Sequence, residues 1–154
     1  MRGRKALAIL SAAIVMALHG LSCADAQSRR TGASPAQLVA AAQRGDVRAQ
    51  ARVGFMYETG RGLPQDYYLA ATWYLSAAEQ GYAPAQHRLG LLLDKGQGVP
   101  ENYVEAYKWL NLAAAGAPPG QREHFLRVRD AVARKMTLPQ LERGQWLSSH
   151  WRPR

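Results

Sequence analysis

Apolar positions recur along the middle of the chain at the spacing of amphipathic helices. In residues 47–58, and again in residues 67–78, apolar side chains return at steps of three and four, which places them on one face of a helix. The stretch 81–116 repeats the stretch 45–80 at an offset of 36 residues, with 13 identical positions. A fixed period of this length predicts a repeat array, in which neighbouring units bury one another's apolar faces.

Each unit is predicted to be a helix, a tight loop and a second helix. The Gly-Arg-Gly sequence at 60–62 ends the first helix, because glycine readily adopts the positive φ found at many helix C-termini, and Pro64 prevents the helix from resuming. The second helix begins after Asp66, a residue type that caps helix N-termini. Asn102 takes the same place one unit later, and with Glu105 it fits the spacing of a capping box.

A glycine inside each first helix indicates close packing. Gly54 and Gly90 occupy equivalent positions, although glycine costs about 1 kcal/mol relative to alanine in a helix interior. We therefore expect a second helix to press against each glycine and leave no room for a Cβ. On that second helix, Trp73 is predicted to be the large buried side chain and the alanines around it to be the small ones.

The repeat pattern weakens at both ends of the array. Residues 34–44 are predicted to form an N-terminal capping helix, and residues 117–154 two basic C-terminal capping helices at about 119–135 and 139–150. A capping box at Thr137–Gln140 opens the last helix, whose predicted apolar stripe is Leu141, Trp146 and Leu147. The expected fold is all-α, an α-solenoid of stacked antiparallel helix pairs with full repeats at 45–80 and 81–116.

Residues 1–26 have the pattern of a signal peptide. Three basic residues within the first five precede the apolar run 6–18, which is too short to span a bilayer, and small residues at 24 and 26 form a cleavage site. We expect a mature start at Gln27, a flexible leader over 27–33 and a periplasmic or secreted protein. Lipoprotein processing at Cys23 is the alternative. The sequence contains no run of 18 apolar residues, so it predicts no membrane span.

The net charge of +9 matters because it is unevenly distributed. The two repeats, residues 45–116, hold six basic and seven acidic residues, so they are nearly neutral. Residues 117–154 hold eight basic and three acidic residues, so the C-terminal helices carry much of the positive charge. A basic protein can bind nucleic acid, but an exported protein seldom meets it, and we do not expect nucleic acid to be the partner.

The repeat resembles the Sel1-like repeat family, a branch of the tetratricopeptide-like α-solenoids. The resemblance rests on A-Q-x-x-[VL]-G at 49–54 and 85–90, on G-x-G-[LV]-P at 60–64 and 96–100, and on Y-x-x-A-x-x-W-x-x-x-A-A at 67–78 and 103–114. It implies a non-catalytic module for protein–protein interaction, of the kind used as adaptors in bacterial envelope and stress pathways.

The sequence offers no set of residues suited to catalysis or metal binding. His87, His124 and His150 lack a helical ligand partner, and the predicted mature chain has no cysteine. The carboxylates, Glu58 and Asp94 among them, are expected on exposed helix faces, with no spacing that marks an acid–base pair. The loop at 60–62 follows a helix and precedes a proline, which favours a turn over a phosphate-binding loop. We therefore predict no enzyme activity, no cofactor and no metal.

The candidate binding residues leave the apolar stripe of the first helices and are expected on the concave face of the solenoid: Arg48, Arg52, His87 and Arg88. Arg52 and Arg88 are equivalent, so they can lie in register and grip carboxylates of a peptide or protein partner. The alternative is a basic surface that binds anionic envelope polymers or lipid head groups through Arg122, Arg127, Arg129 and Arg134. The apolar ends of a two-repeat array also leave weak self-association open.

Overall fold

The structure, a computed structural model, describes residues 33–154. The predicted signal peptide, Cys23 and all but the last residue of the predicted leader lie outside the described residues. All the described helices belong to one compact unit, Pro35–Arg154.

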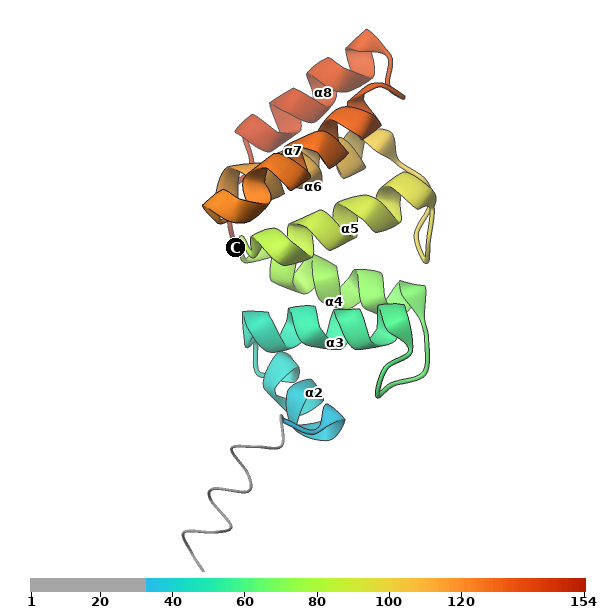
Figure 1. Ribbon diagram of the computed structural model, residues 1–154, viewed down its shortest axis with the longest axis vertical. Helices are drawn as coiled ribbons and strands as arrows, with labels where there is room; N and C mark the ends of the chain where they lie inside the picture. Colours follow the sequence, from blue (N-terminus) through green and yellow to red (C-terminus); the bar gives the residue numbers. More distant parts are fainter. Residues whose placement is uncertain (1–32) are drawn as a thin grey trace, which may run out of the picture. The chain divides into compact units, whose positions relative to one another are not determined.

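Helices make up the regular structure of residues 33–154, which contain no strand, and this confirms the all-α prediction. Consecutive helices pack on one another from α2 to α7, with α3, α5 and α7 along one side of the stack and α4 and α6 behind them (Figure 1). The helices are α2 (Pro35–Gln43), α3 (Val47–Thr59), α4 (Tyr67–Glu79), α5 (Ala83–Lys95), α6 (Tyr103–Gly116), α7 (Pro119–Ala133) and α8 (Leu138–Ser149). The pairs α3–α4 and α5–α6 are the two repeats.

The helix ends follow the local sequence signals. Gly60 ends α3 at φ 70°, in the left-handed region that glycine adopts without steric cost. Asp66 caps α4 by accepting a hydrogen bond from the backbone N–H of Leu69 at 2.9 Å. Asn102 caps α6 in the same way at 3.1 Å, but the predicted capping box is incomplete, because the Glu105 side chain forms an ion pair with Lys108.

The helices of each repeat approach as closely as the internal glycines predict. A Cβ added at Gly54 would lie 2.8 Å from the ring of Tyr74, and one at Gly90 would lie 2.6 Å from Cγ of Leu110. Tyr74 and Leu110 are both fully buried, so neither could move aside easily. Trp73, predicted to be the large buried side chain, is only partly buried and packs on the small core between α2 and α3.

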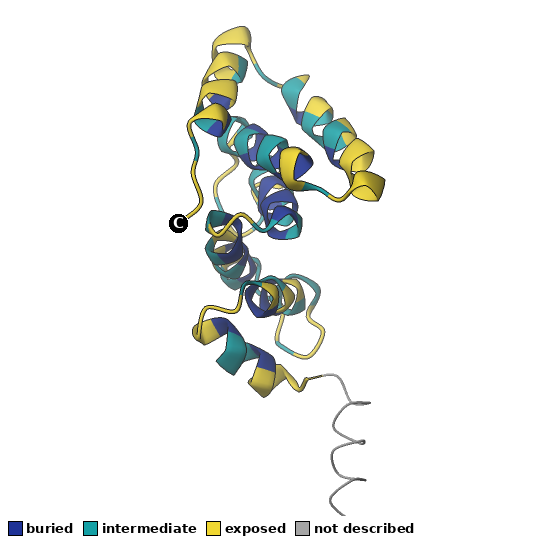
Figure 2. Cartoon of the chain, turned by 90° about the vertical axis from the view of Figure 1, so that its left-hand side faces the viewer, coloured by how far each residue is buried: buried dark blue, intermediate teal, exposed yellow. Residues whose placement is uncertain are grey.

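The two C-terminal helices each pack mainly on α6 and diverge from one another (Figure 2). The predicted apolar stripe of α8 is wrong at Trp146, which is 57% exposed and stacks on His150. The residues of α8 that are buried are Gly144 and Ser148, four positions apart. The physical reason is close approach: Gly144 lies against the ring of Tyr107, where a Cβ would come within 2.9 Å.

The last residues fold back from α8 to the end of α4. The Trp151 ring meets the Trp109 ring edge-to-face at 6.0 Å, and Pro153 lies beside Gly81. The backbone N–H of Arg154 donates a hydrogen bond to the carbonyl of Glu79 at 2.8 Å, and the two side chains form an ion pair. The C-terminal segment therefore joins the end of the array to the first repeat, a contact that the sequence analysis did not anticipate.

The lengths and hydropathies of the helices in residues 33–154 fall short of what a membrane-spanning helix requires.

Candidate functional site

The side of the stack formed by α3, α5 and α7 carries two hollows that share a wall. The α3–α5 hollow, of about 320 Å³, is lined by Arg48, Arg52, Phe55 and Arg88 among others, with Tyr74 of α4 beneath. The α5–α7 hollow, of about 380 Å³, lies on the other side of Arg88. Because Pro84 and Arg88 line both, the two hollows form one interrupted groove across three helices.

The structure brings three of the four predicted binding residues together in the α3–α5 hollow. Arg48 and Arg52 are exposed on α3, and neither has a hydrogen-bond or ion-pair partner within residues 33–154. Arg88 projects from α5 in the wall between the hollows. His87 is different, because it is only 7% exposed and lines the α5–α7 hollow but not the α3–α5 hollow.

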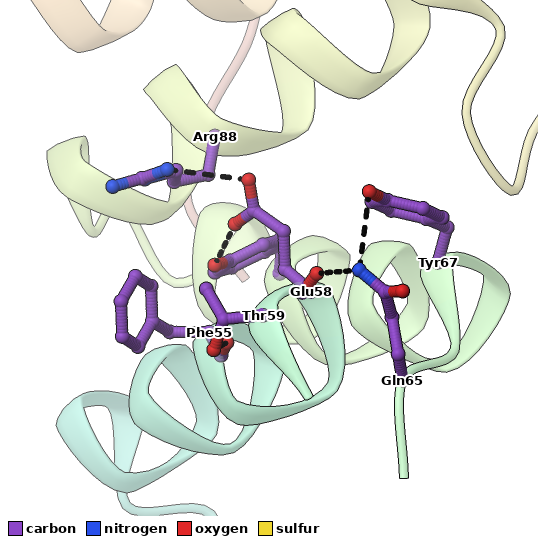
Figure 3. A network of polar contacts seen from close by, with 7 residues as sticks. Phe55, Glu58, Thr59, Gln65, Tyr67 and Arg88 are labelled. Carbon is purple, nitrogen blue, oxygen red and sulfur yellow. Dashed lines mark hydrogen bonds and ion pairs between the residues drawn. The ribbon is translucent and has the colours of Figure 1, made fainter. Parts of the chain in front are cut away.

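Arg88 is held by a carboxylate that the sequence analysis expected to be solvated. Arg88 Nη1 lies 3.2 Å from Glu58 Oε1, and Glu58 extends from α3 to reach it (Figure 3). The hydroxyl of Tyr74 donates a hydrogen bond of 2.6 Å to the other carboxylate oxygen. Burial, reinforced by this bond to Glu58, raises the pKa of Tyr74, so the phenol remains protonated and keeps donating. The expectation for Glu58 was wrong because its partners belong to other helices.

The Arg88 guanidinium also lies 5.4 Å above the centre of the Phe55 ring, which is partly exposed. Cation–π contact and the single ion-pair contact together fix the arginine without using all five of its N–H donors. Its side chain remains 42% exposed. Arg88 is therefore oriented in advance and still has donors to offer on the groove side.

His87 packs between apolar and aromatic neighbours. Its ring stacks on Phe125 at 4.1 Å and meets His124 at 5.5 Å, both on α7. Its Nδ1 atom is buried with no hydrogen-bond partner in the described chain. Burial, assisted by the charges of the nearby His124 and Arg88, lowers the pKa of His87 to about 4, so the imidazole is neutral at pH 7.

The contribution of α7 to this groove was not predicted from the sequence. His124 and Phe125 line the α5–α7 hollow, although they were assigned to a capping helix. The signal was present in the period, because Arg52, Arg88 and His124 stand 36 residues apart and on successive members of the α3, α5 and α7 row. α7 therefore takes the place of the first helix of a further unit after the consensus residues have ended, although α8 packs mainly on α6 and not on α7.

The groove is electropositive because basic side chains line it and acidic side chains lie elsewhere. No acidic residue among residues 33–154 lines either hollow. Of the seven acidic residues of the two repeats, Glu58 is the one that reaches this side to contact a groove residue, and it does so from behind Arg88. The nearly neutral repeats thus present an uneven distribution of charge, with positive charge along the groove.

The basic residues of the alternative site are partly engaged within the protein. Arg127 pairs with Glu123, and Arg129 contacts both Asp130 and the side chain of Asn111. Arg122 and Arg134 have no ion-pair or hydrogen-bond partner of their side chains within residues 33–154. The predicted set of four cations is therefore divided: two have partners on α7 itself, and one of these two, Arg129, also links α7 to α6 through Asn111.

Nowhere in residues 33–154 do three or more histidine, cysteine or acidic side chains converge as metal ligands would. A third hollow, between α4 and α6, has mainly apolar walls that include Leu75 and Trp109.

Replacing Glu58 with glutamine should strengthen the attraction of the groove for acidic ligands and weaken the fold. The neutral amide no longer offsets the charge of Arg88, while Tyr74 can still donate to its oxygen. Loss of a half-buried ion pair is expected to lower the free energy of unfolding by about 1 kcal/mol. Urea unfolding measures the stability, and titration with an acidic peptide measures the attraction; an affinity equal to or below that of the wild type would contradict the expectation.

Comparison with known proteins identifies the two helix pairs. The Sel1 repeat family matches residues 47–82 and 83–117, close to the two repeat units of the structure. No curated protein sequence matches the chain.

Two solved structures have the same arrangement of helices. A protective antigen of uropathogenic Escherichia coli, which displays an SLR fold, is 30% identical over 82% of this chain, with a TM-score of 0.70. A Sel1 repeat protein from Oxalobacter formigenes is 36% identical over 54% of this chain, with a TM-score of 0.53. The chain spans 28% and 34% of the lengths of these proteins, respectively.

Proposed function

We propose, from the premise that this chain is a Sel1 repeat protein, that it is a non-catalytic adaptor that binds a peptide or protein segment in the groove of α3, α5 and α7. Sel1 repeats mediate protein–protein interaction, so the proposal concerns where this chain binds and what it recognises. The observation that carries it is the pair of unpartnered arginines, Arg48 and Arg52, beside an Arg88 that is already oriented.

The groove has the properties of a recognition surface for a partner of opposite charge. Its cations are exposed and near one another, and aromatic and apolar side chains such as Phe55 and Leu91 lie between them. Positive charge at the rim favours encounter with an acidic partner and sets its orientation, whereas the apolar patches supply buried contact area. Arginines and aromatic residues are the types that most often dominate binding energy at interfaces.

The signal peptide pattern of residues 1–26 extends the proposal to the site of action. An exported adaptor would meet its partner in the periplasm or outside the cell, where envelope and secreted proteins are the available ligands. The nearly neutral repeats and the charged groove then serve selectivity among those proteins rather than general attraction to anionic surfaces.

Capture from an envelope extract, with the protein as bait, tests the proposal. The variant Arg48→Glu, Arg52→Glu reverses two charges that have no internal partner, so the fold should persist while partner binding falls at least tenfold, about 1.4 kcal/mol. Arg88 is left unchanged, since its replacement would strand Glu58.

The matched control is Arg61→Glu, Lys95→Glu, which changes the net charge equally at exposed positions outside the hollows. Retention of the partner by the control and its loss from the groove variant support the proposal. A partner that both variants retain at low salt, and that high salt removes from both, would instead assign binding to a dispersed basic surface.

A further inference from the structure

The α5–α7 hollow contains a polar group whose condition is unusual for a protein interior. His87 is more than nine-tenths buried, yet its Nδ1 has no hydrogen-bond partner in the described chain. Buried polar atoms are paired in the great majority of cases, and an unpaired one loses the free energy of its hydration without replacement. No hydrogen bond within the described chain accounts for a buried histidine at this position, which suggests a role in binding.

The environment of His87 determines which nitrogen carries the proton. A proton on Nδ1 would bury an N–H with no acceptor, which is the rarer defect in proteins; an unpaired acceptor is tolerated more often. The proton therefore belongs on Nε2. This nitrogen also makes no hydrogen bond within residues 33–154, but unlike Nδ1 it is not sealed from solvent. The histidine thus presents one N–H donor to the hollow that it lines.

Arg88 supplies the charge beside this donor. Its contact with Glu58 involves one nitrogen and one oxygen, and Tyr74 occupies the other carboxylate oxygen. The remaining N–H groups of the guanidinium are left for an acceptor in the groove. Gln121 and His124 provide further polar groups on the α7 wall.

We infer that the α5–α7 hollow is a carboxylate-binding subsite, in which Arg88 and His87 hold a carboxylate of the bound peptide. The inference rests on the proposed function, because it assigns one part of the peptide to one part of the groove. Apolar walls formed by Pro84, Leu91 and Phe125 lower the local polarity, which strengthens an ionic hydrogen bond. With about 380 Å³, the hollow accommodates a side chain or a chain end rather than a helix.

The charge balance of the hollow favours an anion over a cation or a neutral group. No acidic residue of the described chain lines it, and Glu58 lies behind Arg88. Glu123, which neighbours His124 in the sequence, is exposed and paired with Arg127. An incoming carboxylate meets two donors and no repulsive partner in the walls. It would also raise the low pKa of His87, since a nearby negative charge favours the imidazolium.

Titration with small probes tests the subsite without knowledge of the partner. N-acetyl-leucine carries a chain-end carboxylate, and N-acetylglutamate α-amide carries a side-chain carboxylate. The matched neutral probe, N-acetylglutamine α-amide, carries no carboxylate. Histidine-labelled protein at pH 7 reports binding through the imidazole signals of His87 and His124. We expect saturable shifts with one or both carboxylates and at least tenfold weaker binding of the neutral amide. The stronger carboxylate probe identifies the source, chain end or side chain.

Two variants locate the probe. Arg88→Gln removes the charge and should weaken carboxylate binding at least tenfold, read from the His124 signals. His87→Phe preserves stacking on Phe125 and should weaken it severalfold, so the test survives if the first variant folds poorly. Arg61→Gln, an exposed arginine outside the hollow, should bind as the wild type does.

Three results would overturn the subsite: no saturable shift with either carboxylate, equal binding of the neutral amide, or equal binding of inorganic phosphate, which would indicate a general anion site. Failure here is distinguishable from failure of the proposed function. A protein that captures a partner through Arg48 and Arg52 but ignores the carboxylate probes retains the function and loses the subsite.

Discussion

Replacing Gly98 with alanine is expected to lower the free energy of unfolding by about 3–5 kcal/mol, from the combined cost of a left-handed backbone and of overpacking. Gly98 has a φ of 71°, which L residues other than glycine seldom adopt. A Cβ there would also collide with the backbone of Tyr67, at the first turn of α4. Neither the backbone of a capped helix nor the loop can move aside without disturbing the contact between the repeats. Urea or guanidinium unfolding measures the loss.

The equivalent glycine of the first repeat provides the control. Gly62 also has a positive φ, of 87°, but a Cβ there would meet the terminal methyl group of Met56, at 2.8 Å. That methyl group can rotate away, so Gly62→Ala should cost about 1–2 kcal/mol, chiefly from the backbone. Equal losses at the two positions would mean that the contact of Gly98 with the preceding repeat does not limit the fold.

Acidification below pH 6.5 should destabilise the protein through His87 by roughly 3 kcal/mol when complete. The unfolded histidine takes up a proton near pH 6.5, whereas the folded one does so near pH 4, so the unfolded state binds more protons between these values. Stability from this group is therefore full above pH 6.5, falls as the pH decreases, and stops falling below about pH 4. Burial is the main cause, with the charges of His124 and Arg88 opposing protonation as well.

The variant His87→Phe separates this effect from the titration of carboxylates. Phenylalanine keeps the stacking on Phe125 and has no proton to gain. The unfolding free energy of the variant should therefore change less between pH 7 and pH 4.5 than that of the wild type. Denaturant unfolding at a series of pH values measures the difference between the two proteins. Parallel curves of unfolding free energy against pH for the wild type and the variant would contradict the expectation, because they would mean that folding does not lower the pKa of His87.

The two repeats could be predicted because their signals are local. The period of 36 residues, the Asp66 and Asn102 caps and the glycines at 60 and 96 act within a few residues, and the structure confirms the helices that they delimit. The close approach at Gly54 and Gly90 could also be inferred, because a glycine repeated at a helix interior has few other physical reasons.

The environment of the groove could not be predicted in the same way. Arg48, Arg52 and Arg88 were found from their departure from the apolar stripe, but the partner of Arg88 stands 30 residues away on another helix. His87 looked like an exposed residue because burial depends on α7, whose repeat signals have faded. Periodicity gives the direction of a side chain from its own helix, and it does not say what the neighbouring helix places over it.

The last helix shows a further limit of periodicity. Its large apolar residues, Trp146 included, suggested the buried face, yet Gly144 and Ser148 are buried instead. Ser148 accepts a hydrogen bond from Asn111, which in turn accepts one from Arg129, so a polar link through α6 joins α8 to α7. A face selected by close approach and by polar links carries no hydrophobic pattern for the sequence to reveal.

The folded-back C-terminal segment changes how a short array can come apart. In a linear solenoid, contacts join sequence neighbours, so units can fray one after another from a free end. Here Trp151 and Arg154 reach Trp109 and Glu79, which makes a closed circuit of contacts around α5 and α6. The second repeat cannot open without releasing the segment, and fraying of the segment removes contacts from the end of α4. Two repeats, too few for much cooperativity through neighbours alone, gain it from the short segment that follows α8.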